Sequence, residues 1–403
     1  MRHRALVAAL AVVLAGCAAG VLSGASPHEV ERFVRQHWRS PLAPQGPPPA
    51  GFSPLEASLA PEACGTCHPA QLADWTTSVH AASMGPGVAG QLVEMLERAP
   101  GDAPGCYVCH APLAEQQPLA VKPGAAGEWI ANPVFDRPLH LRGVVCAACH
   151  VRAHERFAPP RRDGSTANSA PSERLPHGGA TRTPAFLRSE FCRDCHQFTP
   201  DGFALNGKLL QNTYEEWRVS RFARAGVQCQ DCHMPDRRHL WRGIHDEAMV
   251  RSGLTIALAR EPMPGGVAAT LRVENTGVGH AFPTYVTPLV VLRAELIDPG
   301  GRVIPDSRAE HVIGRQVELD LSRELTDTRL LPGEHATLRY RRPAGAGTRA
   351  RFSVVVYPDA FYTAFFEVLL RQGAGRGTAR IEEALAATRR SWFMVFMEEV
   401  APG

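Results

Sequence analysis

The sequence predicts an α+β chain of several domains, in which short helices and loops precede a β-sandwich-like region and C-terminal helices. Between residues 61 and 250, prolines and glycines are frequent and one short cysteine motif recurs, which favours short helices joined by loops. From Leu254 onward, strand-like apolar runs alternate with turns. The expected segments are residues 1–17, 18–60, 61–250, 251–358 and 359–403.

The recurring motif is Cys-x-x-Cys-His, which occurs five times and uses ten of the eleven cysteines. Its two thiols can bond to the two vinyl groups of one porphyrin, and its His can bind the iron. Zinc sites pair Cys-x-x-Cys with a distant second pair and do not require a His after each pair. We therefore predict five covalently bound haem c groups. The attachment residues, numbered motif 1 to motif 5, are Cys64/Cys67/His68, Cys106/Cys109/His110, Cys146/Cys149/His150, Cys192/Cys195/His196 and Cys229/Cys232/His233.

The motifs are densely spaced, because their first cysteines lie only 37 to 46 residues apart. Five porphyrins in so short a segment must share walls, which favours fast electron transfer between neighbours. The formal charge of +3 omits the haem propionates, which add negative charge. The basic sequence is therefore no argument for nucleic acid, and no nucleic-acid partner is expected.

The first residues are typical of a bacterial lipoprotein signal peptide. Met1–Arg4 is basic, Ala5–Leu14 is apolar, and Leu14–Cys17 has the pattern of a lipobox. We expect cleavage after residue 16 and lipidation of Cys17, which would hold the protein at a membrane. Ala18 after the cysteine favours the outer membrane over the inner one, by resemblance to bacterial lipoproteins. An ordinary signal peptide, or an uncleaved anchor extending to about Leu22, stays open.

Residues 28–38 favour a short helix with Val30, Phe33, Val34 and Trp38 on one face, and residues 40–54 are typical of a linker.

A low-spin haem needs a second axial ligand, most often His or Met. His80 is expected on an amphipathic helix over residues 72–81 that leaves motif 1, where a surface His is the alternative. His140 and His154 flank motif 3 and should serve different haems. His177 begins a glycine-rich turn, which leaves it free either to reach an iron or to stay in solvent.

Three further histidines follow motif 5. His239 and His245 do not share a helix face at their spacing, so one should be a ligand and the other a propionate contact; we favour His245 as the ligand. His280 lies between glycines in a loop of the next region and can reach back to an iron. Met84 and Met234 are conceivable ligands, but Met more often fills gaps in packing.

The last third of the chain predicts a β-sandwich followed by helices over residues 361–371 and 379–397. It is expected to cover the haems and supply His280, or alternatively to dock a partner. The expected strands are residues 254–259, 267–273, 289–296, 336–340 and 351–357, with turns at 298–301 and 332–334.

Several flanking segments resemble bacterial multihaem c-type cytochromes, related to the tetrahaem cytochrome of nitrifiers and to the hydroxylamine oxidoreductase and nitrite reductase superfamily. The resemblance covers roughly residues 61–290 and rests on residues 75–80, 214–217, 226–234, 239–245 and 279–284. Pentahaem nitrite reductases bind their catalytic haem through a Lys, whereas all five motifs here end in His. No tyrosine is placed by the sequence to cross-link a porphyrin, as in hydroxylamine oxidoreductases.

These observations favour an electron carrier with no catalytic residues over an enzyme. We expect an exported, lipid-anchored pentahaem cytochrome that passes electrons between partners in the periplasm or at the outer membrane, such as quinol-linked or other cytochromes. One alternative is an oxidoreductase with one open haem iron that acts on a small nitrogen or sulfur compound. Another is a subunit of a larger respiratory or extracellular complex.

Overall fold

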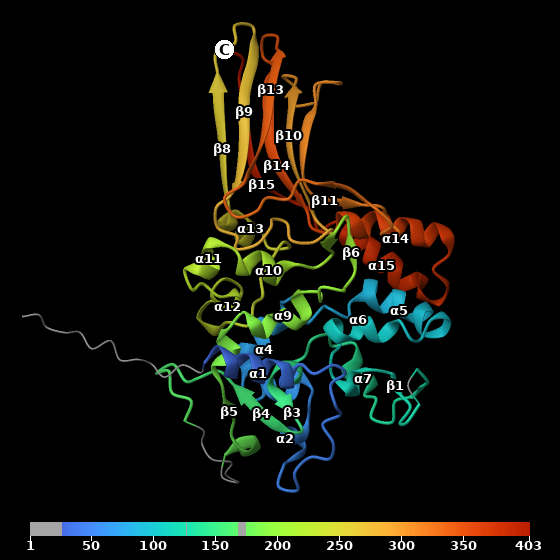
Figure 1. The fold of residues 1–403 in the computed structure, drawn as a ribbon. Coiled ribbons are helices and arrows are strands. Elements are labelled where there is room, and N and C mark those ends of the chain that lie inside the picture. The colour runs from blue at the N-terminus through green and yellow to red at the C-terminus, as the bar shows by residue number, and fades with distance from the viewer. Residues whose placement is uncertain (1–25, 126, 168–174) are drawn as a thin grey trace, which may run out of the picture.

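The computed structural model describes residues 26–125, 127–167 and 175–403, and it combines a body of short helices with a tower of long strands (Figure 1). The fold is therefore mixed α and β with several small sheets. The proposed signal peptide and Cys17 lie outside the described residues. None of the described helices is long and apolar enough to cross a membrane.

The body is built from short helices. Their bounds are α1 (Pro27–His37), α2 (Pro54–Ala57), α3 (Pro61–Gly65), α4 (Pro69–Thr76), α5 (Pro86–Arg98), α6 (Ala103–His110), α7 (Arg137–His140), α8 (Cys146–His150), α9 (Glu190–His196), α10 (Thr213–Arg218), α11 (Arg221–Arg224), α12 (Cys229–His233) and α13 (Glu247–Gly253). The helix expected near residues 28–38 is α1, which begins with a capping box between Ser26 and Glu29 and buries Val30 and Val34.

The helix expected over residues 72–81 is wrong beyond Thr77. Helix α4 ends at Thr76, where the Thr77 hydroxyl donates to the Asp74 carbonyl and the Ser78 hydroxyl to the Trp75 carbonyl. Such local side-chain bonds to the backbone compete with helix continuation. His80 therefore lies in a turn.

Two antiparallel sheets form the tower, with strand orders β12-β11-β10-β14-β15 and β13-β9-β8. Their strands are β8 (Leu254–Glu261), β9 (Gly266–Asn275), β10 (Leu289–Ile297), β11 (Ala309–Val317), β12 (Glu324–Asp327), β13 (His335–Pro343), β14 (Arg349–Tyr357) and β15 (Phe393–Val400). Small sheets in the body use β1 (Leu119–Val121), β2 (Trp129–Ala131), β3 (Val151–Arg152), β4 (Glu155–Ala158), β5 (Thr181–Arg182), β6 (Ala204–Leu205) and β7 (Lys208–Leu209). All five expected strands are present.

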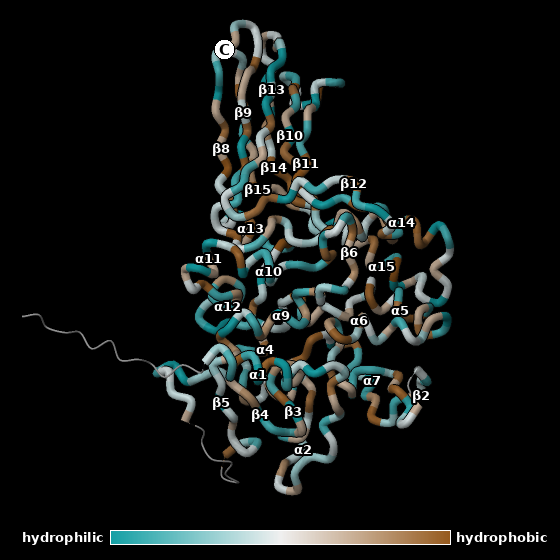
Figure 2. Tube along the Cα trace, in the orientation of Figure 1, coloured by the Kyte–Doolittle hydropathy of each residue, from teal (hydrophilic) through white to brown (hydrophobic). Residues whose placement is uncertain are grey.

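The core of the tower lies between its two sheets. Figure 2 shows hydrophobic and hydrophilic residues mixed along the strands, and Leu271, Leu292 and Phe352 are fully buried. Each fully buried side chain of this kind stabilises the fold by about 1.5–3 kcal/mol. The core therefore makes the tower a rigid support for the loops at its base.

The helix expected over residues 379–397 is wrong in its second half. Helix α15 (Thr378–Thr388) ends early, and β15 then pairs with β14 through Val354↔Phe396 and Ala350↔Val400. Pairing buries Val395 and Val400 against the sheet, so tertiary contact outweighs the local helical pattern.

Helices α14 (Ala360–Gln372) and α15 pack beside α5, and the approach of α15 to α5 depends on a glycine. A Cβ on Gly377 would meet the Gly90 backbone carbonyl in α5. Gly377→Ala should therefore destabilise the haem-loaded protein by about 1–3 kcal/mol in chemical denaturation. Gly345→Ala, where an added Cβ meets nothing within 4 Å, is the control. Equal effects of the two changes would contradict this packing.

Charged side chains join the tower to the body. On its own, burial would raise the pKa of Asp327, but hydrogen bonds and charge from Arg329 and Lys208 outweigh it and hold the pKa below its usual range. A carboxyl whose pKa is depressed by folding stabilises the folded state above its unfolded pKa, about 3.9, and loses that contribution as pH falls toward the folded value.

The contribution of Asp327 to the stability of the folded protein should therefore decrease in acid. Thermal unfolding followed between pH 6 and pH 3 should show a smaller loss of stability for Asp327→Asn than for the unchanged protein, because the amide does not titrate. Parallel pH profiles for the two proteins would show that Asp327 does not contribute in this way.

Candidate haem sites

Short helices present the attachment motifs. The motif lies in α6, α8, α9 and α12, each of which ends at the motif His. In a helix, residues three apart lie on one face, so both cysteines of such a motif point to the same side. Motif 1 differs, since α3 ends at Gly65 and its His68 forms the N-cap of α4.

The second cysteine of motif 1, Cys67, lies at the surface of the protein. It lies in the turn after α3, where its N–H donates to the Cys64 carbonyl at 3.2 Å, and its side chain is exposed, whereas Cys64 is half-buried. The reason is that the chain leaves α3 at Gly65 and starts α4 at Pro69, so the turn between them lies at the surface. Cys232 of motif 5 is exposed as well. Attachment of a haem through these cysteines stays a prediction.

Four motif histidines have a fixed ring orientation, because Nδ1 of each hydrogen-bonds an oxygen. A ring that donates from Nδ1 keeps Nε2 free for a metal. The chemistry of these donors therefore fits haem iron. The bonds join His110 to the Ser83 carbonyl at 2.6 Å, His150 to the Phe157 carbonyl at 2.8 Å, His196 to the Tyr285 hydroxyl at 2.8 Å and His233 to the Arg242 carbonyl at 2.6 Å.

Three motif histidines face a second imidazole. Two imidazoles that bind one metal, each at about 2.0–2.1 Å, have ring centres about 6 Å apart. The observed separations fit this arrangement, so each pair can hold an iron between its rings. The pairs are His196 with His80 at 6.2 Å, His150 with His239 at 6.2 Å and His233 with His280 at 6.3 Å between ring centroids.

Burial keeps these rings neutral. It lowers the pKa of His80 to about 3 and those of His150, His196 and His280 to about 4, with neighbouring histidines acting in the same direction. Only neutral imidazole has a free lone pair for a metal, so the sites are ready to bind near neutral pH.

The other four predicted ligands lie apart from these pairs. His140 donates from Nδ1 to the Gln116 carbonyl at 2.6 Å and lies beside Tyr107 in α6. His177 donates from Nδ1 to the Gly179 carbonyl at 2.9 Å. His154 is buried, and its Nε2 donates to the Gly46 carbonyl at 3.0 Å.

His245, which the sequence favoured over His239, is 43% exposed and holds Asp359 through Nε2 at 3.0 Å. His239 instead faces motif 3, where the Asp74 carboxylate accepts its backbone N–H at 3.0 Å and also pairs with Arg238 at 2.6 Å. Asp74 therefore orients the segment that carries His239.

The attachment cysteines of different motifs touch. The thiols of Cys64 and Cys146, and those of Cys192 and Cys229, lie close enough to shift each other's pKa, and the Cys109 thiol donates to the Cys195 carbonyl at 3.9 Å. Motif 1 thus contacts motif 3, and motif 4 contacts both motif 2 and motif 5. Cys149 of motif 3 also lies near the two cysteines of motif 4. The five motifs form one connected network with motif 4 at its branch point.

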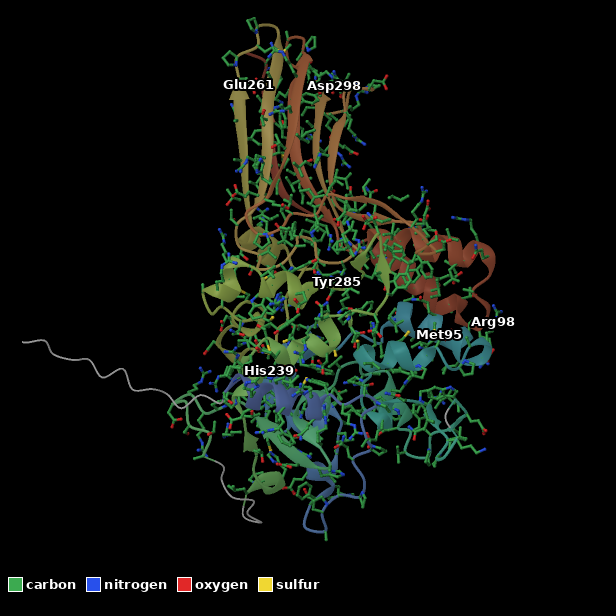
Figure 3. All side chains as sticks on the ribbon, in the orientation of Figure 1. Met95, Arg98, His239, Glu261, Tyr285 and Asp298 are labelled. Carbon is green, nitrogen blue, oxygen red and sulfur yellow. The ribbon has the colours of Figure 1, made fainter. Side chains whose placement is uncertain are left out.

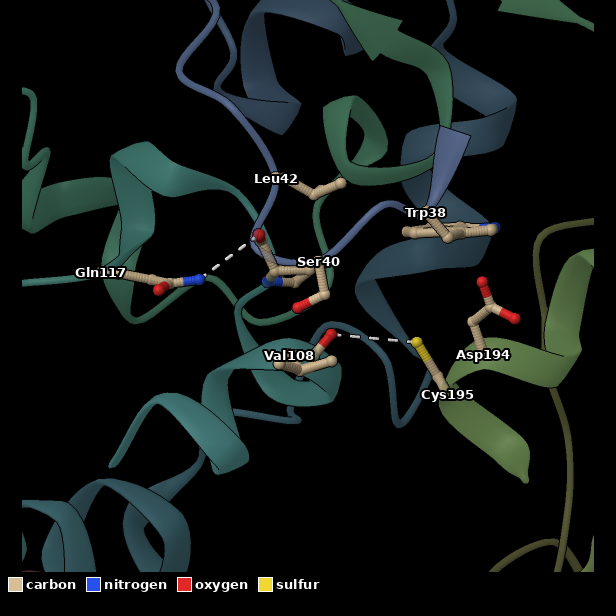
Figure 4. Close-up of a pocket in the computed structure, with 8 residues that line it drawn as sticks. Trp38, Ser40, Leu42, Val108, Gln117, Asp194 and Cys195 are labelled. Carbon is tan, nitrogen blue, oxygen red and sulfur yellow. Dashed lines mark hydrogen bonds between the residues drawn. The ribbon is translucent and has the colours of Figure 1, made fainter. Parts of the chain in front are cut away.

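A small cavity separates motif 2 from motif 4 (Figure 4). The Cys195 thiol reaches across to the Val108 carbonyl at 3.9 Å, and Trp38 and Leu42 close the other side. Burial raises the pKa of Asp194, which also lines the cavity. Residues of motif 2 and motif 4 therefore line the same cavity.

The loop of residues 279–285 brings His280 and Tyr285 from the tower to the body, and Tyr285 lies where the two regions meet (Figure 3). The Glu216 carboxylate of α10 accepts the Ala281 N–H at 3.1 Å, and Arg329 donates to the Thr284 carbonyl at 3.0 Å. The sequence assigned no role to Tyr285 or Glu216, although Glu216 lies within residues 214–217, which carry part of the family resemblance, and Tyr285 directly follows the segment 279–284.

Comparisons with known proteins concern the first three motifs and the overall fold. Residues 63–151, which contain motifs 1 to 3, match the family model for cytochrome c554 and c-prime. The fold is similar to that of a penta-heme cytochrome c552 from Thermochromatium tepidum, with a TM-score of 0.61, 20% identity and coverage of 86% of this chain and 99% of that chain. No curated protein matches the chain significantly. Together with the attachment motifs, these similarities support a multihaem c-type cytochrome that binds haem c covalently and transfers electrons.

Proposed function

We propose that this chain is an exported pentahaem c-type cytochrome that passes electrons between redox partners, with one haem at each motif. The observation that carries this proposal is the set of three facing imidazole pairs at 6.2–6.3 Å. Two histidines per iron leave no coordination position for a substrate, as an electron carrier requires.

The chain's own residues bind and orient the cofactors. Cysteine pairs fix each porphyrin, Nδ1 hydrogen bonds fix the proximal rings, and burial keeps the distal rings neutral. When bound, haem iron supplies a one-electron redox change. Contacts between motifs keep successive cofactors close, so electrons can cross the body. His239 takes the axial role in preference to His245, and His140, His154 and His177 are candidate ligands for motifs 1 and 2.

We further propose that Cys17 carries a lipid anchor on the periplasmic side or surface of the outer membrane, or alternatively on the inner membrane facing the periplasm. Cytochrome c maturation occurs outside the bacterial cytoplasmic membrane, so export is required. The partners would be quinol-linked or other periplasmic and outer-membrane cytochromes. Incorporation of labelled fatty acid into the unchanged protein, but not into Cys17→Ser, would support the anchor.

The first test is spectroscopic. The haem-loaded protein should show only low-spin signals in optical and electron paramagnetic resonance spectra, and cyanide should leave them unchanged. If about one haem in five is high-spin and binds cyanide, an iron is open. The oxidoreductase acting on a small nitrogen or sulfur compound would then replace the carrier.

A further inference from the structure

The proximal His of motif 4 differs from the others in its hydrogen-bond partner. The Nδ1 acceptors at motifs 2, 3 and 5 are the backbone carbonyls of Ser83, Phe157 and Arg242, which can only accept. Nδ1 of His196 instead meets the hydroxyl of Tyr285 at 2.8 Å. A hydroxyl both accepts and donates, so Tyr285 can accept a hydrogen bond from His196 and donate one to a further acceptor.

Further hydrogen bonds continue from Tyr285 into α10. The Thr213 side chain lies close enough to the phenol to lower its pKa, and its hydroxyl lies 2.7 Å from that of Thr284. The Thr284 hydroxyl donates to Glu216 Oε2 at 3.3 Å. The carboxylate of Glu216 is buried, and its other oxygen pairs with Arg329 at 3.2 Å.

The donors in this chain have one direction. A His that binds iron through Nε2 carries its proton on Nδ1, so His196 donates to Tyr285. A carboxylate only accepts, so Thr284 donates to Glu216. Thr213 then donates to Thr284, which leaves the Thr213 oxygen free to accept from the Tyr285 hydroxyl. Hydrogen bonds aligned in this way polarise one another in a low-dielectric interior.

We propose that Glu216 lowers the reduction potential of the haem at motif 4 through the chain Thr284, Thr213, Tyr285 and His196, an inference that rests on the proposed function. A stronger acceptor at Nδ1 makes the imidazole a more basic ligand, and a more basic ligand stabilises the oxidised iron. Tyr285, Thr213, Thr284 and Glu216 are therefore positioning residues that touch no iron themselves.

Motif 4 is the branch point of the network, so its potential affects every route. Its cysteines contact motifs 2 and 5 and lie near motif 3. A lower potential at this point makes electrons reside on the outer motifs and cross the centre only in transit. Loss of the hydrogen-bond chain should remove this difference in potential between motif 4 and the motifs around it.

Potentiometric titration of the haem-loaded variants tests the proposal. Tyr285→Phe should raise a single one of the midpoint potentials, with at least a tenfold change in that reduction equilibrium, which is 59 mV for one electron. The electron paramagnetic resonance g-values of the same haem should change. Thr213→Val should shift the same potential in the same direction, which keeps the test open if Tyr285→Phe fails to load haem.

A double-mutant cycle separates the chain from a through-space effect. Glu216→Gln should raise the same potential alone but add no further shift to Tyr285→Phe, because the chain is already broken there. Additive shifts would overturn the proposal, as would unchanged potentials in both Tyr285→Phe and Thr213→Val.

The matched control is Tyr340→Phe, which removes a buried phenol that donates to the Ser307 carbonyl at 2.7 Å inside the tower. It should leave all potentials in place, and a shift of the motif 4 potential by this change would also count against the chain. Failure of the proposed function is recognised separately, because the unchanged protein would then contain a high-spin haem that binds cyanide.

Discussion

Replacing any one of His80, His239 and His280 by Ala should open one haem iron. Each ring faces a motif histidine at 6.2–6.3 Å between ring centroids, so its removal leaves that iron with one protein ligand. Each variant should show a new high-spin signal from one haem, and this haem should bind added cyanide or carbon monoxide. Optical and electron paramagnetic resonance spectra measure both effects.

His245→Ala is the matched control for this series. His245 is 43% exposed and its Nε2 holds Asp359, so its removal should leave every haem low-spin. A high-spin haem in His245→Ala together with an unchanged spectrum in His239→Ala would reverse the assignment. The variant pair thus decides between two histidines that lie six positions apart.

The attachment residues could be found in the sequence because each motif is contiguous. The spacing of two cysteines and a His within five residues is enough to recognise the motif. The structure adds the helices that contain motifs 2 to 5. The exposure of Cys67 and Cys232 could not be read from the motif, because it depends on how the rest of the protein packs around each cysteine. The facing rings are different, because each pair joins distant parts of the chain. Spacing alone could not choose between His239 and His245, since the choice depends on Asp74, 165 positions before His239.

The hydrogen-bond chain that links His196 to Glu216 could not be predicted from the sequence for the same reason. Tyr285 lies 89 positions after His196, and its neighbours in sequence give no sign of a buried partner. Only the packing of the tower loop on α10 brings the two side chains together. Hydrogen bonds between side chains of distant elements follow from tertiary packing and leave no periodic pattern.

Strand β11 was missed because its polar residues hide its position in a sheet. It contains Arg315, a residue type that is rarely fully buried, yet this side chain has no exposed area. Its guanidinium donates to the carbonyls of Leu205, Lys208 and Leu209 and pairs with Glu324 at 2.8 Å. A charged residue therefore fills an internal position by joining the β6–β7 hairpin to the tower.

Arg315→Ala should consequently be among the most destabilising single changes. It would leave Glu324, whose side chain is 6% exposed, without its buried partner, and three carbonyls of the hairpin without a donor. Removing one partner of a buried ion pair costs up to about 3–5 kcal/mol, and the remaining pair of Glu324 with Lys208 at 2.7 Å should offset part of this loss. Chemical denaturation of the haem-loaded protein, followed by tryptophan fluorescence and haem absorption, measures the loss.

Two further variants make this test specific. Arg315→Lys keeps the charge but cannot reproduce the planar set of donors, so its stability should lie between those of the Ala variant and the unchanged protein. Arg302→Ala removes an 86% exposed arginine that pairs with Asp298 at 3.2 Å, and it should leave the unfolding free energy unchanged within error. If Arg315→Ala were as stable as Arg302→Ala, the attachment of the hairpin to the tower would not depend on Arg315, and the pairs of Lys208 with Glu324 and Asp327 would be enough to hold it.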